Sequence, residues 1–333
     1  MKKLMNKPSG FVDEMLEGLV AANPSLALGG ETGRVVHRAA ATREGKVGVV
    51  SGGGSGHLPL FTGYVGEGLL DACSIGNVFE GPTVGSCMEA IRIADGGKGV
   101  LRLYGNYGGD RMNFDMAGEM LEDDGIRTTT VLGNDDVASA GPQERHKRRG
   151  VAGIIYAYKT AGALAETGAD LDTVTAIARK TVDRTRTIGV ALSPCQVPGS
   201  DKPSFTLGEN EIEMGMGIHG EPGIWRDQLR QADAIADEMI ERLLADMPEG
   251  AGKTASILVN SLGATPLEEL FILYRRARAK LEAAGITIVR PLVGHYATSM
   301  EMAGASLSLC FVDDEIEALL AAPARCPFWT VTA

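Results

Sequence analysis

The amino-acid sequence predicts an α/β protein with two domains, each a β-sheet covered by helices, the first sheet largely parallel. Three observations predict this class. The chain has 333 residues, a length comfortable for two domains. In the first part of the chain, short apolar runs alternate with segments of helical spacing. A stretch rich in turn-forming residues, 193–203, then interrupts this pattern. We therefore expect one domain at 1–192 and a second at 193–333.

The first expected domain opens with a helix, because residues between 11 and 22 are apolar at helical spacing. A strand at 46–51 follows and leads directly into glycines. Beyond it, helices are predicted at 84–94, 111–121, 153–165 and 171–184, and strands at 99–104, 127–132 and 188–192. Alternation of this kind is typical of a mostly parallel sheet with helices packed on it.

In the second expected domain, alternating charged and apolar residues predict a half-buried strand at 211–218 that ends at His219. A helix is predicted at 228–245 and a strand at 256–260. Thr265, Pro266 and Glu268 match a capping box, so the next helix is expected to begin with Thr265 as its N-cap. The last predicted strands are 286–289 and 306–312.

Composition narrows the classes of function. The net charge of -11 predicts a surface that repels nucleic acid and anionic membranes. The five cysteines are scattered and have no metal-ligand spacing, which indicates free thiols in a reducing compartment. The N-terminus lacks an apolar signal segment, and no apolar run is long enough to cross a membrane. We therefore expect a cytoplasmic protein.

Ser51–His57 places a histidine after a run of glycines that follows a predicted strand. Such a turn can point backbone N–H groups at a ligand. The segment is neither a P-loop, because no Gly-Lys-Ser/Thr follows, nor a dinucleotide fingerprint, because His57 stands where its last glycine belongs. A tight turn with no ligand is the alternative.

Asn106–Asp110 follows the predicted strand at 99–104, and ligands of open α/β sheets bind beyond the carboxyl ends of strands. Asp110 is therefore placed like a general base. The alternative, favoured by spacing alone, is that Asp110 caps the helix expected from Arg111.

His219 is followed by the turn sequence Gly-Glu-Pro-Gly. A neutral imidazole can add to a reactive carbonyl, and a glycine-rich turn leaves room for a substrate. A hydrogen-bonded structural histidine is the alternative. The only compact basic run, His146–Arg149, is expected to be a solvated loop, with a contact to an acidic partner as the other possibility.

Seven segments that run through almost the whole chain carry a family resemblance: 51–57, 106–110, 113–114, 148–150, 202–206, 217–224 and 262–267. In sequence and in order they resemble the hallmark segments of the substrate-binding subunits of dihydroxyacetone kinases. In that family a histidine captures the substrate carbonyl as a covalent hemiaminal. The matching residue here is His219.

The resemblance implies further site residues. The family's carboxylate beside the hydroxyl that receives phosphate matches Asp110, and its glycine-loop histidine matches His57. Gly54, Ser55 and Gly56 match the loop that contacts the substrate. The implied activity is a kinase that phosphorylates an alcohol group of a short-chain ketose.

The implied cofactors and partners lie outside this chain. The sequence has neither a P-loop nor an acidic cluster for Mg²⁺ and phosphate. The resemblance implies a separate subunit that carries the nucleotide with Mg²⁺. The phosphate donor would be ATP bound there, or a phosphotransferase-system protein that rephosphorylates bound ADP. A homodimer is also implied, with no metal on this chain and no contact with nucleic acid or membrane.

Two positions depart from the family pattern. Gly105 stands where the family has a lysine before the Asn-Tyr pair, and Leu58 stands where it has a glutamate after the loop histidine. Replacing lysine by glycine removes a donor to a substrate hydroxyl and opens space. A four-carbon ketose such as erythrulose is therefore expected as a candidate substrate beside dihydroxyacetone.

Two other functions are alternatives to this one. A non-catalytic ketose sensor that acts as coactivator of a transcription regulator would need His219 but no base, so the presence of His57 and Asp110 disfavours it. A stand-alone sugar-binding or isomerising protein is disfavoured by the lack of metal-ligand spacing and of a signal peptide.

Overall fold

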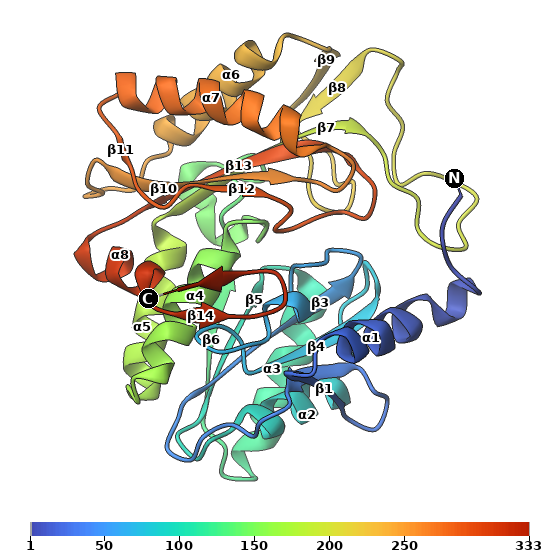
Figure 1. Cartoon of the computed structure of the whole chain (residues 1–333), viewed down its shortest axis with the longest axis vertical. Helices are drawn as coiled ribbons and strands as arrows, with labels where there is room; N and C mark the ends of the chain where they lie inside the picture. The colour runs from blue at the N-terminus through green and yellow to red at the C-terminus, as the bar shows by residue number, and fades with distance from the viewer. Residues whose placement is uncertain (1, 333) are drawn as a thin grey trace. The chain divides into compact units, whose positions relative to one another are not determined.

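The computed structural model describes residues 2–332, which form two compact units (Figure 1). The first unit comprises the chain up to residue 132, residues 156–180 and the chain from residue 318 on. The second comprises residues 133–155 and 181–317. The domain boundary expected at residue 192 stays a prediction.

The first unit contains a six-stranded sheet. In spatial order its strands are β1 (Leu26–Gly29), β2 (Val35–Arg38), β4 (Ala72–Val78), β3 (Gly48–Ser55), β5 (Val100–Gly105) and β6 (Thr128–Gly133). Strand β3 is parallel to both of its neighbours, β4 and β5, whereas β1 and β2 add to the sheet in antiparallel fashion. The expected parallel sheet is therefore present at its centre. Strands β1, β2 and β4 were not predicted from the sequence.

Helices cover both faces of this sheet. The long helices are α1 (Phe11–Ala22), α2 (Val84–Ala94), α3 (Gly108–Glu122), α4 (Ile154–Glu166) and α5 (Leu171–Asp183). Helices α2 and α3 pack on one face, where the Phe114 ring of α3 stacks on Tyr104 of β5 with ring centres 4.4 Å apart. Side chains alternate along a strand, so Ser51 of β3 points to the other face and shares a hydrogen bond of 2.7 Å with Tyr158 of α4.

The first unit contains a buried ion pair between Lys46 and Asp71. Lys46 and Asp71 are each 1% exposed, and the Lys46 ammonium lies 2.6 and 2.7 Å from the two Asp71 carboxylate oxygens. Asp71 also accepts the backbone N–H of Val49 at 2.9 Å and contacts Arg38 at 3.1 Å. Removing one partner of such a buried ion pair destabilises the folded protein, because the remaining charge is then buried without compensation.

The second unit contains a seven-stranded sheet that is mostly antiparallel. Its main path is β11 (Thr287–Ile288), β10 (Thr254–Ser261), β13 (Ala303–Phe311), β7 (Thr185–Ser193), β8 (Glu211–Met214) and β9 (Trp225–Gln228), while β12 (Leu292–Gly294) pairs with β10. Strands β11 and β12 run parallel to β10. Both sheets are flanked by helices, so the α/β class predicted from the sequence is confirmed.

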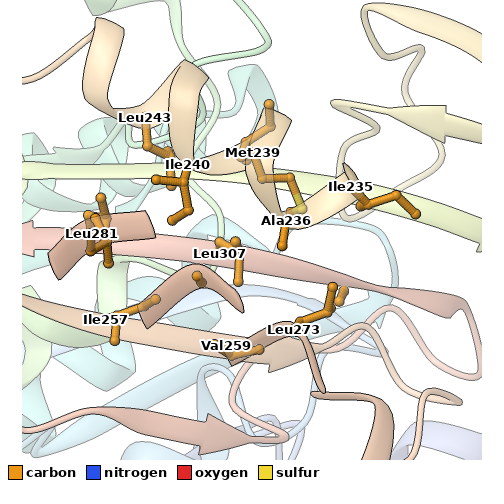
Figure 2. Packing of buried hydrophobic residues seen from close by; sticks show 14 of the residues in the cluster. Ile235, Ala236, Met239, Ile240, Leu243, Ile257, Val259, Leu273, Leu281 and Leu307 are labelled. Carbon is orange, nitrogen blue, oxygen red and sulfur yellow. The ribbon is translucent and has the colours of Figure 1, made fainter. Parts of the chain in front are cut away.

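Helices α6 (Ala232–Ala245) and α7 (Leu267–Ala283) cover one face of the second sheet. Figure 2 shows Met239 and Ile240 of α6 directed toward Leu307 of β13, one of the strands beneath them. Apolar residues recur at helical spacing along α6 and are buried, which is the arrangement that the hydrophobic effect favours for a helix on a sheet.

The remaining elements are short. They are the 3-10 helices η1 (Pro8–Gly10), η2 (Thr62–Tyr64) and η3 (Pro142–Lys147), the helix α8 (Asp314–Ala321) and a small hairpin of β14 (Ala324–Arg325) and β15 (Thr330–Val331). Within residues 2–332, no helix is both long and apolar enough to span a bilayer. All five cysteines are free and buried.

Two sequence-based predictions in the second unit were wrong. Strand β8 ends at Met214 rather than at residue 218, because Gly215 adopts a left-handed φ of 81° that breaks the extended chain. The capping box is also not formed, since α7 begins at Leu267 and its N-cap is Pro266. The Thr265 hydroxyl instead accepts the backbone N–H of Gly304 at 2.8 Å.

Candidate functional site

The glycine run of the first unit lies inside a strand. Strand β3 continues to Ser55, so the turn expected after Ser51 begins only at Gly56, whose φ is 100°. A side chain on Gly53 would collide with the Phe61 ring, and one on Gly54 would come within 2.8 Å of the backbone of Phe79. These glycines therefore allow neighbouring segments to approach the strand closely.

His57 is held between two aromatic rings. Its side chain is buried, and its ring stacks on Phe79 with centres 5.0 Å apart and planes 25° apart. The Phe61 ring meets it edge-on at 6.1 Å. Both phenylalanines have left-handed backbone angles, with φ of 70° at Phe61 and 61° at Phe79. Such angles are costly for bulky residues and concentrate at functional sites, where the surrounding structure enforces them.

Asp110 is the third residue of α3, not its cap. The helix begins at Gly108 with Tyr107 as N-cap, so the prediction that Asp110 caps a helix starting at Arg111 was wrong. The carboxylate still lies in the first turn, where the helix dipole favours a negative charge. It lies beside Gly81, because a methyl group built on Gly81 would be 3.1 Å from the Asp110 Oδ1 atom.

Gly105 is the last residue of β5, and its carbonyl oxygen accepts the backbone N–H of Tyr107 at 2.8 Å. Strands β3 and β5 are adjacent and parallel, with Val49 opposite Leu101. Their carboxyl ends therefore emerge at the same edge of the sheet. This edge carries six of the seven predicted site residues: Gly54, Ser55, Gly56, His57, Gly105 and Asp110.

The seventh predicted residue, His219, belongs to the second unit and is half-buried in a turn after β8. The Nδ1 atom of His219 lies 2.8 Å from the Glu221 Oε1 atom, and the His219 backbone N–H donates to Glu221 Oε2 at 2.5 Å. The turn is closed by a hydrogen bond of 3.1 Å from the Gly217 N–H to the Glu221 carbonyl. Gly220 has a φ of 89°, an angle that favours glycine.

Hydrogen bonding controls the charge of Glu221. Burial alone would raise the pKa of its carboxyl group, but the hydrogen bond and electrostatic interaction with His219, followed by a backbone hydrogen bond and the charge of Arg149, outweigh it and lower that pKa to about 2. Glu221 is therefore an ionised carboxylate at neutral pH. Glu221 was not predicted as a site residue: its place two residues after His219 is the only local signal, and that spacing does not show that its carboxylate turns back onto the ring.

The basic run is not a solvated loop throughout. His146 and Lys147 are exposed, but Arg148 is 1% exposed and donates to both carboxylate oxygens of Asp246, at 2.6 and 3.0 Å. Arg149 pairs with Asp136 at 2.8 Å. The expectation of a solvated loop was therefore wrong for these two arginines, because buried carboxylates of the same unit bind them.

No group of three metal-binding side chains is found in the part of the chain that the structure describes, residues 2–332. The titratable groups among the predicted site residues are histidines and a carboxylate, to which the structure adds Glu221. The His219–Glu221 pair can present a nucleophilic imidazole, and the edge of the first sheet combines a carboxylate with a buried histidine.

Comparisons with known proteins show the family. A family model described as the Dak1 domain matches residues 17–328. The dihydroxyacetone-binding subunit of a PTS-dependent dihydroxyacetone kinase of Listeria innocua is 44% identical over 332 residues, which covers 99% of this chain and 100% of that protein. An L-erythrulose 1-kinase of Mycolicibacterium smegmatis is 41% identical over 331 residues, covering 98% of this chain and 58% of that protein.

A solved structure shares the fold over nearly its full length. It is a dihydroxyacetone kinase operon co-activator with a TM-score of 0.89 and 36% sequence identity, and the match covers 95% of this chain and 97% of that one. Proteins with this fold thus include both named kinase subunits and a named co-activator.

Proposed function

Because this chain belongs to the Dak1 domain family, the family of dihydroxyacetone kinase substrate-binding subunits, we propose that it is the ketose-binding subunit of a two-component kinase. The observation that carries the proposal is the match, over that protein's whole length, to the dihydroxyacetone-binding subunit of a PTS-dependent kinase. The site geometry supports it, because His57 and Asp110 lie at the edge of the first sheet where β3 and β5 end, and His219 lies half-buried in a turn beside an ionised Glu221.

The proposed role of His219 is covalent capture of the ketose. The lone pair of its Nε2 atom attacks the carbonyl carbon, the π electrons move to the carbonyl oxygen, and that oxygen takes up a proton to become a hydroxyl. The resulting hemiaminal fixes the sugar in one orientation, so that a diffusive encounter becomes a positioned one. Polyols such as glycerol have no carbonyl and are excluded.

The proposed roles of Asp110 and His57 concern the hydroxyl that receives phosphate. Asp110 accepts the proton of that hydroxyl as general base, and His57 holds the hydroxyl by a hydrogen bond. The rigid packing of His57 between Phe61 and Phe79 supports this assignment, because a positioning residue must itself be fixed. Gly54, Ser55 and Gly56 contact the sugar with backbone and small side chains.

The phosphoryl donor is proposed to lie on a partner. A nucleotide-bearing subunit with Mg²⁺ supplies the phosphate, and a phosphotransferase-system phosphocarrier renews it where ADP stays bound. The full-length match to a subunit of a PTS-dependent kinase supports this division of labour. We propose further that the subunit forms a homodimer and acts in the cytoplasm, where both kinds of donor occur.

The proposed substrate is dihydroxyacetone or a four-carbon ketose such as erythrulose. Relatives named for each substrate are 44% and 41% identical to this chain, so overall identity does not separate them. Gly105 is proposed to favour the larger sugar, because this buried last residue of β5 lacks the long side chain that the family pattern has at its position.

The test is reconstitution. The protein alone should phosphorylate no ketose, and activity should appear when a nucleotide-loaded partner subunit is added. Intact-protein mass spectrometry under non-denaturing conditions should show a ketose adduct that His219→Ala abolishes. Robust turnover by this chain without a partner, or an adduct that survives in His219→Ala, would contradict the proposal.

A second candidate is a ketose-sensing co-activator, which the structural match to an operon co-activator favours. A sensor would form the same adduct on His219 but would support no phosphorylation with any nucleotide-bearing subunit. An adduct without turnover, combined with binding to a transcription regulator, would favour this second function over the first.

A further inference from the structure

One carboxylate holds His219 at two points. Glu221 Oε1 lies 2.8 Å from the ring Nδ1 of His219, while Glu221 Oε2 accepts the backbone N–H of the same residue at 2.5 Å. The two contacts fix the ring relative to its own backbone. Both side chains are partly exposed, His219 by 22% and Glu221 by 32%, so the pair stays accessible to a small molecule.

The ionised state of Glu221 determines which ring nitrogen carries the proton. The pKa of Glu221 is about 2, and an ionised carboxylate can only accept hydrogen bonds. In the bond between Nδ1 and Oε1 the imidazole must therefore be the donor. In the neutral ring the proton lies on Nδ1, and the lone pair lies on Nε2.

A second layer holds Glu221 in place. The Arg149 Nη1 atom lies 3.9 Å from Glu221 Oε2, and Arg149 Nη2 donates to the carbonyl oxygen of Gly215 at 3.1 Å. On its other side, Arg149 Nε donates to Asp136 at 2.9 Å. A side chain on Gly217 would collide with the Glu221 carboxylate and come within 2.6 Å of Arg149, so glycine at this position lets the two groups meet.

We propose that Glu221, supported by Arg149 and Asp136, is the positioning residue that holds His219 in the tautomer with a nucleophilic Nε2. The inference rests on the proposed capture of a ketose by His219. When Nε2 forms the C–N bond, the carbonyl oxygen takes a proton from solvent and the proton on Nδ1 stays in place. The ring then carries a positive charge that faces the Glu221 carboxylate, which stabilises the adduct.

The competing interpretation is that Glu221 only closes the turn. Glu213 provides a matched comparison, because this 3% exposed carboxylate holds the end of the same turn. Its two oxygens accept the backbone N–H of Gly223 and the Arg226 Nε, each at 2.6 Å. A purely structural role for Glu221 predicts that Glu221→Ala and Glu213→Gln act alike.

The experiment is ¹⁵N NMR of the histidine rings in the protein without ketose, at neutral to mildly alkaline pH. The His219 signals are identified by their loss in His219→Asn. In the wild type we expect protonated Nδ1 and unprotonated Nε2. In Glu221→Ala the tautomer with the proton on Nε2 should gain population, whereas Glu213→Gln should keep the wild-type tautomer.

Adduct formation gives the second readout. By mass spectrometry with dihydroxyacetone or erythrulose, Glu221→Ala should bind the ketose roughly 10- to 100-fold more weakly, the scale of one charge-assisted hydrogen bond. A wild-type His219 protonated mainly on Nε2, or an unchanged tautomer in Glu221→Ala, overturns the inference. If the wild type forms no adduct with any ketose, the proposed function fails, while the NMR result still decides the role of Glu221.

Discussion

Asp110→Asn separates two roles for one carboxylate. Asp110 lies in the first turn of α3, so a negative charge there stabilises the helix whether or not it takes part in catalysis. It also lies at the edge of the sheet where β5 ends, the position proposed for a general base. Asparagine keeps the size of the side chain and removes both its charge and its basicity.

The two roles differ in magnitude. A charge in the first turn of a helix is worth about 0.3–1 kcal/mol of folding free energy, and the substitution should cost no more than that. A general base contributes roughly 10²- to 10⁴-fold in rate. At 1.36 kcal/mol per tenfold, this corresponds to about 2.7–5.4 kcal/mol of activation free energy. Loss of a general base should therefore lower kcat strongly and change the free energy of unfolding very little.

The assay measures kcat at saturating ketose with a nucleotide-loaded partner subunit, together with urea unfolding of the same protein. We expect Asp110→Asn to lower kcat by at least about 100-fold while the ketose adduct persists. Glu268→Gln is the matched control, because Glu268 is an exposed acidic residue in the first turn of α7. If kcat for Asp110→Asn is within about threefold of the wild type, Asp110 is not a general base and acts only by stabilising the first turn of α3.

Three further predictions follow from the same residues. Gly105→Lys should shift the preference in kcat/KM from erythrulose toward dihydroxyacetone. If competition assays show the same preferred ketose in both proteins, the missing side chain at residue 105 does not set substrate size. Asp71→Asn should lower the free energy of unfolding by about 3–5 kcal/mol in urea titrations, because buried Lys46 loses its short ion pair and keeps only the longer contact of 3.7 Å to Glu166; a loss below about 1 kcal/mol would contradict this. Because its pKa is about 2 instead of 4.5, ionised Glu221 contributes stability above pH 4.5 that is lost as the pH falls toward 2. That contribution is about 1–2 kcal/mol after allowance for its partial exposure, and Glu221→Gln should abolish it; an equal acid response of both proteins in urea would refute it.

The spacing of apolar residues predicted the long helices and strands well, because this spacing lies within each segment itself. Helix α2 occupies the predicted range 84–94, since its buried residues recur at helical spacing within the segment itself. Strand β4 was missed although it lies at the centre of the first sheet. Its sequence, Ala-Cys-Ser-Ile-Gly-Asn-Val, has few strongly β-forming residues, and its place depends on pairing with β2 and β3.

For the glycine-rich segments, too, the sequence predicted the location but not the exact boundaries of the elements. Their position after apolar runs marked them as places where a ligand could approach, and this made His57, Asp110 and His219 the predicted site residues. Local spacing misplaced the start of α3, the length of β3 and the end of β8, the last of which is set by the left-handed Gly215. The aromatic rings around His57 come from residues 61 and 79, which no local pattern connects.

By itself the sequence determined the α/β class, the family, and the residue types available for chemistry, because periodicity and motif order can be read along the chain. Only the tertiary structure decided the partners of those residues. Glu221 is ionised because folding places its carboxylate against the His219 ring and, to a smaller extent, near Arg149, more than 60 positions earlier in the chain. Charge state and tautomer depend on distances of a few ångströms, and folding sets those distances.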